Sequence, residues 1–224
     1  MLPNTEYGVS NLGGHNLALL VTVSIWGLRL SWYLNVRNWG QGEDLRYQKI
    51  RKKYGTKFWW QSLFLIFGFQ GVVMLIITLP IVFVMSFGST LAVSWQTWLA
   101  VSVFAVGFVF EAGGDWQLKK FKSKVENRGK VLNTGLWSLT RHPNYFGDAM
   151  QWFGFALFAV ALPHGYWCFI SPVVMTYFLR RVTGVTLLEK DLAQKTPEYV
   201  AYMSTVPAFL PKPVHNLFGL IKNP

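Results

Sequence analysis

The sequence predicts an all-α integral membrane protein with about five membrane-spanning helices. Apolar residues make up 52% of the 224-residue chain and charged residues only 14%, whereas a soluble domain has about 25% charged residues. Five stretches approach the roughly 20 mainly apolar residues that a spanning helix needs. Because such a chain cannot cover a water-facing surface with polar groups, we expect lipid around a single membrane domain that comprises residues 1–224.

The apolar stretches are separated by turns and by cation-rich loops. The predicted spans are, in order, residues 16–36, 60–86, 94–116, 145–162 and 165–181. Pro80 predicts a kink or an early end in the second span. Residues 186–203 predict one or two short amphipathic helices on the cytoplasmic side, with Pro197 in the first turn of the second. The proline-containing tail is expected to be extended.

The distribution of cations predicts the orientation. Of the 21 Lys and Arg residues, seven lie in residues 37–59, seven in 117–144 and six from Arg180 onward, whereas the alternate connections have none. Loops rich in Lys and Arg stay in the cytoplasm. The pattern therefore predicts an outer N-terminus, an inner C-terminus and an odd number of spans.

Charge and cysteine content restrict the function further. The net charge is +11, but the cations lie between apolar stretches, which favours anionic lipid headgroups and phosphorylated small molecules over nucleic acid as partners. The single cysteine excludes an intramolecular disulfide framework and a multi-cysteine metal site. No other grouping of residues in the sequence predicts a metal site.

Three charged residues are expected at membrane depth, where charge is costly and is often functional. Arg29 needs a partner or a polar cavity, and its alternatives are a salt bridge between helices or snorkelling to the interface. Glu111 and Asp115 are four residues apart and share one helix face. They either pair with Lys119 and Lys120 or accept hydrogen bonds from ribose hydroxyls or an amide.

The segment 135–148 contains the most concentrated polar pattern. Pro143 suits the first turn of the fourth span, so Arg141 and His142 come just before a helix N-terminus, which favours an anion. Asn144 and Asp148 share one face of that helix. The cluster predicts a site for a phosphate-bearing or polar cofactor, and the alternative is a capped helix start with an interfacial arginine.

Cations outside this segment could serve the same cofactor. Lys122, Arg128 and Lys130 suit phosphates, although a loop that binds lipid headgroups is the competing interpretation. Arg181 and Glu189 could point back at the site from beyond the fifth span, or could act as an interfacial anchor and a surface salt bridge.

Six segments resemble, in order, a bacterial membrane family that is catalogued as a domain of unknown function and is allied to the C-terminal domain of steroid 5α-reductases. The segments are WGLRLSWYL (26–34), GEDLRY (42–47), DWQLKKFK (115–122), NRGKV (127–131), TRHPNYFGD (140–148) and VTGVTLLEK (182–190). The resemblance covers about residues 20–212. Its RHPNYFG motif is specific for a superfamily that also contains sterol C14-reductases and isoprenylcysteine carboxyl methyltransferases.

The resemblance implies a membrane oxidoreductase, in a bacterial inner membrane, that transfers a hydride from NADPH to the C=C bond of a lipophilic, steroid-like or enone-like substrate. The implied catalytic residues are Asp148, Tyr33 and Glu189. By position, the implied cofactor-binding residues are Glu111, Asp115, Lys122, Arg128, Lys130, Arg141, His142, Asn144, Tyr145 and Arg181. The methyltransferase branch implies S-adenosylmethionine at the same segment instead, with an arginine and a glutamate after the last span.

The chain departs from the family near its N-terminus. Members usually have about two further hydrophobic helices before the helix that starts here near Asn16. Trp26 stands at the position of a tyrosine that polarises the substrate ketone in steroid 5α-reductases, and Tyr33 lies two turns further along. The departure leaves open a different substrate, completion of the site by oligomerisation, or a non-catalytic membrane protein.

Overall fold

Long apolar runs fold into long helices because a helix satisfies its own backbone hydrogen bonds in lipid. The computed structural model describes residues 12–40, 42–43, 45–88, 90–182 and 184–212, and these contain helices and no strand. The α-helices are α1 (Gly14–Asn38), α2 (Leu45–Tyr54), α3 (Phe58–Ser62), α4 (Phe69–Phe87), α5 (Trp95–Lys122), α6 (Pro143–Ala159), α7 (Ile170–Tyr177), α8 (Val185–Lys195) and α9 (Pro197–Thr205).

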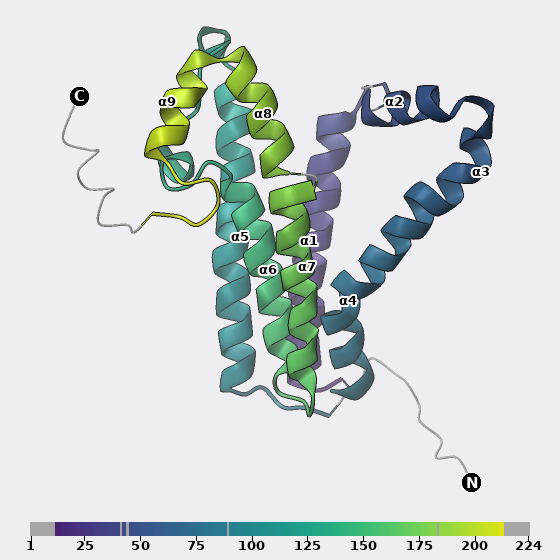
Figure 1. Cartoon of the computed structure of the whole chain (residues 1–224). Helices are drawn as coiled ribbons and strands as arrows, with labels where there is room; N and C mark the ends of the chain where they lie inside the picture. Colours follow the sequence, from purple (N-terminus) through teal and green to yellow (C-terminus); the bar gives the residue numbers. More distant parts are fainter. Residues whose placement is uncertain (1–11, 41, 44, 89, 183, 213–224) are drawn as a thin grey trace, which may run out of the picture.

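Helices α1, α5, α6 and α7 lie side by side, and α4 joins them through its C-terminal part (Figure 1). From there α4 diverges from the bundle toward α3 and α2, with a π-helical segment at Leu63–Gly68. Pro80 lies inside α4, which continues to Phe87, so the predicted early end is wrong. Pro143 and Pro197 are the first residues of α6 and α9, as predicted.

Three helical segments are long and apolar enough to cross a membrane: Gly14–Asn38, Tyr47–Phe87 and Trp95–Lys122. The predicted fourth and fifth spans correspond to α6, with 17 residues, and to α7 with a 3-10 turn before it and a π-turn after it. The structure therefore supports a helical membrane protein, while five spans and their orientation stay predictions. Helix α2, the loop after α5 and helices α8 and α9 all lie at one end of the molecule (Figure 1), which we call the basic end.

The outer surface of the bundle carries large apolar side chains, as expected for contact with lipid. Leu28 on α1 and Leu75 on α4 are both more than 70% exposed. Trp95 and Trp116 are exposed near opposite ends of α5, about 32 Å apart at 1.5 Å per residue. This separation matches the roughly 30 Å hydrocarbon core of a bilayer between two interfacial belts. The buried core between the helices centres on Phe104, Phe155 and Phe158.

Candidate functional site

The contact between α5 and α6 positions the polar side chains of the candidate site. A Cβ atom on Gly147 would lie 2.3 Å from the Glu111 nitrogen and 2.5 Å from the Gly107 carbonyl oxygen. A Cβ atom on Gly107 would lie 2.6 Å from the Gly147 carbonyl oxygen. Only glycine permits this approach of two backbones, which is typical of helix contacts in membranes. The approach brings Glu111 of α5 directly against the face of α6 that carries Asp148.

Arg29 of α1 joins both acidic residues of α5. Its Nη1 atom donates to Glu111 Oε1 at 2.7 Å, and its Nη2 atom donates to Asp115 Oδ2 at 2.5 Å. The side chains of both acids are 7% exposed and that of Arg29 is 17% exposed. The salt-bridge alternative for Arg29 is therefore the observed one, and the alternative pairing of the acids with Lys119 and Lys120 is not seen.

One face of α6 completes this group, which we call the polar cluster (Arg29, Glu111, Asp115, Asn144, Asp148 and Gln151). Asn144 Nδ2 donates to Asp115 Oδ1 at 3.2 Å, and Gln151 Nε2 donates to Glu111 Oε2 at 2.5 Å. Three buried acceptors of the polar cluster have no hydrogen-bond donor among the described residues: Asn144 Oδ1, Asp148 Oδ1 and Gln151 Oε1. Unpaired buried oxygens are uncommon in native proteins, and these three fit a ligand that presents N–H or O–H groups.

Gln151 was not among the predicted site residues, although a signal for it exists. Asn144, Asp148 and Gln151 stand at positions i, i+4 and i+7, which lie on one helix face. Tyr33, the predicted catalytic tyrosine, lies beside the cluster, with the guanidinium carbon of Arg29 5.2 Å from the centre of its ring.

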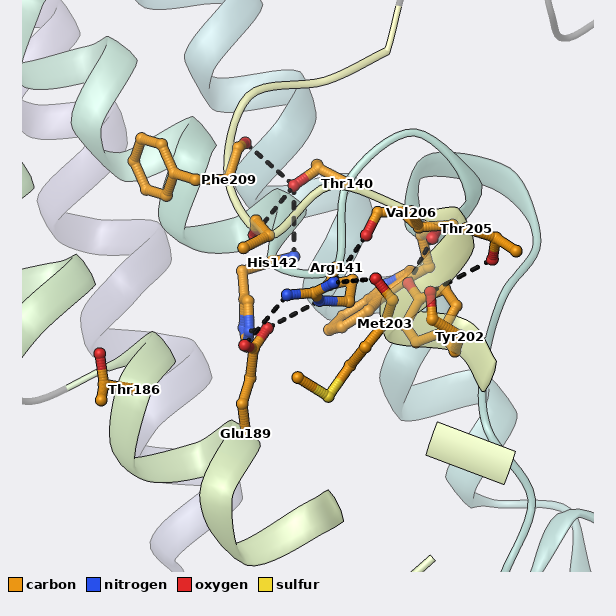
Figure 2. A network of polar contacts seen from close by, with 12 residues as sticks. Thr140, Arg141, His142, Thr186, Glu189, Tyr202, Met203, Thr205, Val206 and Phe209 are labelled. Atoms are coloured by element: carbon orange, nitrogen blue, oxygen red, sulfur yellow. Dashed lines mark hydrogen bonds and ion pairs between the residues drawn. The ribbon is translucent and has the colours of Figure 1, made fainter. Parts of the chain in front are cut away.

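A second group surrounds Arg141, immediately before α6 (Figure 2). Its guanidinium donates to both carboxylate oxygens of Glu189, at 2.7 and 3.0 Å, and to the carbonyl oxygens of Met203 and Val206, each at 2.7 Å. The His142 Nε2 atom lies 3.1 Å from Glu189 Oε1, and the His142 ring stacks on Tyr145. Arg141 is thus occupied by protein partners from α8, α9 and the following turn.

The Arg141 group also fixes the charge of Glu189. Burial alone would raise the pKa of Glu189, but hydrogen bonds from His142 and Arg141, together with their positive charge, hold that pKa below its ordinary value. Burial raises the pKa of nearby Tyr199 to about 12, so this tyrosine is neutral at pH 7. The group is therefore one ionised carboxylate surrounded by donors.

The chain around Arg141 is tied to the C-terminal segment by further hydrogen bonds. Thr140 Oγ1 donates to the Phe209 carbonyl at 2.9 Å (Figure 2). The Arg141 backbone N–H donates to the Pro207 carbonyl at 3.0 Å. The Tyr202 hydroxyl donates to the Trp137 carbonyl. Residues 199–209 are thereby held against the start of α6, at the basic end of the polar cluster.

The remaining predicted residues are cations on the surface. Lys122, Arg128, Lys130 and Arg181 are exposed, and none of them forms an ion pair with a described residue. The first three lie at the end of α5 and in the loop after it, at the basic end. They are free for an anionic ligand or a lipid headgroup. Within the described ranges no group of His, Cys, Asp or Glu could hold a metal ion.

Comparisons with known proteins show the family of the chain and leave the reaction open. The family model described as "Protein of unknown function (DUF1295)" matches residues 7–206. An uncharacterised protein of Schizosaccharomyces pombe is 25% identical over 92% of this chain and 67% of its own length.

Two further relatives match over 63 residues, which are 28% of this chain. The steroid 5-alpha-reductase DET2 of Gossypium hirsutum is 33% identical over 24% of its length, and the probable O-methyltransferase ustE of Ustilaginoidea virens is 40% identical over 22% of its length. The chain thus spans less than a quarter of the length of each. No solved structure matches. None of these relatives is bacterial, so a bacterial origin stays a prediction.

Proposed function

We propose that the chain, which belongs to the family described as protein of unknown function DUF1295, is a membrane-bound reductase. It would use NADPH to reduce a C=C bond of a lipophilic enone. The observation that carries the proposal is the polar cluster, in which three buried oxygens have no donor among the described residues, together with exposed cations at the basic end that form no ion pair with a described residue. The similarity to a steroid 5-alpha-reductase supports the same reaction type.

The residues present fit the nicotinamide half of NADPH. Its carboxamide N–H groups and ribose hydroxyls are the donors that Asn144 Oδ1, Asp148 Oδ1 and Gln151 Oε1 lack. Arg29, with Glu111 and Asp115, would fix the shape of this half of the site. Lys122, Arg128 and Lys130 would hold phosphates, since Lys and Arg are the usual phosphate partners. Arg141, His142, Tyr145 and Glu189 would support the start of α6 rather than bind the phosphates directly.

The chemistry needs one hydride and one proton. When bound, NADPH supplies the hydride for one carbon of the C=C bond. Asp148 would hold the proton for the other carbon, because it is the carboxyl of the cluster without an ion pair among the described side chains. Tyr33 is the alternative proton donor. The bundle faces lipid and would therefore admit an apolar substrate while it excludes water.

A second candidate is methyl transfer from S-adenosylmethionine. It is favoured by the similarity to an O-methyltransferase and by the charge of the cluster, in which three carboxyls face one guanidinium. A net negative site would suit a sulfonium cation. S-adenosylmethionine has no phosphate, however, and would leave Lys122, Arg128 and Lys130 without a ligand. If neither cofactor binds, the remaining hypothesis is a non-catalytic membrane protein.

The test is turnover of a panel of lipophilic enones by the purified full chain, measured as NADPH consumed and saturated ketone formed. We expect Asp148→Asn to lower kcat by about 100-fold or more, since general acid catalysis typically contributes about 10²–10⁴-fold. The control Gln70→Ala, an exposed change on α4, should leave turnover unchanged. Unchanged turnover in Asp148→Asn would remove Asp148 from the mechanism, and absence of turnover with every enone would count against the reductase.

A further inference from the structure

The last turns of α1 carry an open pocket on the side that turns away from the polar cluster. Its volume is about 360 Å³, which is within the range of small-molecule sites. The pocket begins two residues after Arg29, and therefore on the opposite side of the helix from the side chain that reaches the polar cluster. A hydroxyl and two amides are among its lining residues, which are Ser31, Leu34, Asn35, Asn38 and Trp39.

The same face of α1 is apolar on the side of the pocket that is farther from the basic end. Leu28 and Trp32 lie on this face, and each is 74% exposed. Arg29, next to Leu28, bonds to Asp115 at the end of α5 that carries an exposed interfacial tryptophan, so these apolar side chains lie at the edge of the hydrocarbon core. Asn35 lies about 9 Å nearer the basic end than Arg29, at 1.5 Å per residue. The order of apolar side chains and then polar groups matches the order of acyl chain and headgroup in a phospholipid.

Helix α2 supplies positive charge beside this pocket. It begins close to the end of α1 and runs across the basic end toward α3 (Figure 1). Tyr47, Ile50 and Tyr54 share one face of α2 and are partly buried. The Tyr47 hydroxyl accepts a hydrogen bond from Gln70 Nε2 of α4 at 3.3 Å, so this face turns toward the membrane-spanning part of the chain. The opposite face carries three exposed cations, Lys49, Lys52 and Lys53.

The three lysines of α2 have few acidic side chains near them in the sequence. Residues 43–57 contain six Lys or Arg residues and two acids. One of these acids, Glu43, accepts from Arg51 Nη2 at 2.7 Å, whereas the three lysines form no ion pair with a described residue. A helix with one aromatic face and one cationic face is typical of the membrane interface, where its cations attract anionic lipids. The charge of α2 therefore fits a phosphate at the headgroup level.

We propose that the corner between α1 and α2 binds one anionic glycerophospholipid of the leaflet at the basic end. Its phosphate lies against Lys49, Lys52 and Lys53, because lysine is a usual phosphate partner. The amides of Asn35 and Asn38 donate to further oxygens of the headgroup, and an acyl chain follows the exposed apolar face of α1. A free phosphate would use the cations but would leave that apolar face uncovered. The site is separate from the polar cluster and does not depend on the proposed reduction.

The test is native mass spectrometry of the purified full chain in detergent, with added dioleoylphosphatidylglycerol or dioleoylphosphatidylcholine. We expect one retained phosphatidylglycerol per chain and no comparable retention of phosphatidylcholine. Each cation near an anionic lipid contributes about a factor of five to affinity. Phosphatidylglycerol should therefore bind about 100-fold more weakly to the triple variant Lys49→Gln/Lys52→Gln/Lys53→Gln.

The matched control removes the same charge from exposed lysines elsewhere at the basic end. This control, which should keep the wild-type affinity, is Lys119→Gln/Lys120→Gln/Lys124→Gln. A further variant, Asn35→Leu, keeps every lysine and changes an exposed side chain of the pocket. It should weaken phosphatidylglycerol binding about tenfold, as for one lost hydrogen bond to a charged group.

Four outcomes would overturn the lipid site. Equal losses in the two triple variants would show that the whole basic end attracts anionic lipid without a specific site. Unchanged affinity in Asn35→Leu would remove the pocket from the site. Displacement of the lipid by inorganic phosphate would make a free anion the occupant. A lipid-free dimer that Asn35→Leu dissociates would place a second copy of the chain on this face.

Discussion

The close contact of α5 and α6 leads to a prediction whose size follows from the structure. In Gly147→Ala the new Cβ atom would lie 2.3 Å from the Glu111 nitrogen, whereas ordinary contacts begin near 3.4 Å. The two helices must therefore separate by about 1 Å, and overpacking of this kind costs about 1–3 kcal/mol. The separation would also lengthen the Asn144–Asp115 contact, now 3.2 Å, beyond hydrogen-bonding range.

The matched control is Gly71→Ala on α4, where an added Cβ meets no atom within 4 Å. Replacing an exposed helical glycine by alanine is favourable by up to about 1 kcal/mol. The assay is the midpoint of chemical unfolding in detergent, combined with NADPH affinity. We expect a lower midpoint and weaker NADPH binding in Gly147→Ala, and neither effect in Gly71→Ala. Equal midpoints and equal affinities in the two variants would refute the argument that this glycine sets the geometry of the site.

Three further predictions concern charge. Arg29→Leu should lower stability by about 3–5 kcal/mol, because it leaves two buried carboxyls without a cation; equilibrium unfolding in detergent would measure this, and a loss below about 1 kcal/mol would contradict it. The lowered pKa of Glu189 predicts that its ion pairs stabilise the C-terminal helices above the ordinary pKa of 4.5, and that this stability is lost as the pH falls through the lowered pKa. Limited proteolysis of residues 184–209 in the wild type should therefore accelerate on acidification. An equal acceleration in Glu189→Gln would disprove the assignment. Arg128→Ala should weaken NADPH binding by about 10- to 100-fold, as for a lost charged hydrogen bond, with little effect on NADH binding. An equal loss of affinity for both would exclude contact of Arg128 with the 2′-phosphate. The control is Lys124→Ala, a change in the same loop.

Helices and their ends were predictable because they depend on local patterns. Apolar length predicted the long helices, and the prolines at 143 and 197 predicted where α6 and α9 begin. Of the two alternatives predicted at Pro80, the early end is wrong, because α4 continues to Phe87. A proline inside an apolar helix ends the helix only when the freed carbonyl and the proline ring cannot be accommodated. The sequence alone does not show how the residues around Pro80 pack.

The candidate site was predictable only in part. Charge at membrane depth identified Arg29, Glu111 and Asp115, but the pairing between them depends on how α1 packs on α5. The partners of Arg141 were not predictable, since two of them are backbone carbonyls more than 60 positions away, and carbonyl groups have no sequence signature. The glycine contact that joins α5 to α6 likewise follows from the tertiary structure.

The central claim is that the polar cluster binds NADPH, and calorimetric titration of NADPH and S-adenosylmethionine into the purified full chain tests it most directly. The account predicts NADPH binding that weakens in Asn144→Leu, together with stabilisation of about 2.7 kcal/mol at 100 times the Kd. Binding of S-adenosylmethionine alone, or NADPH affinity that is identical in Asn144→Leu, would contradict it.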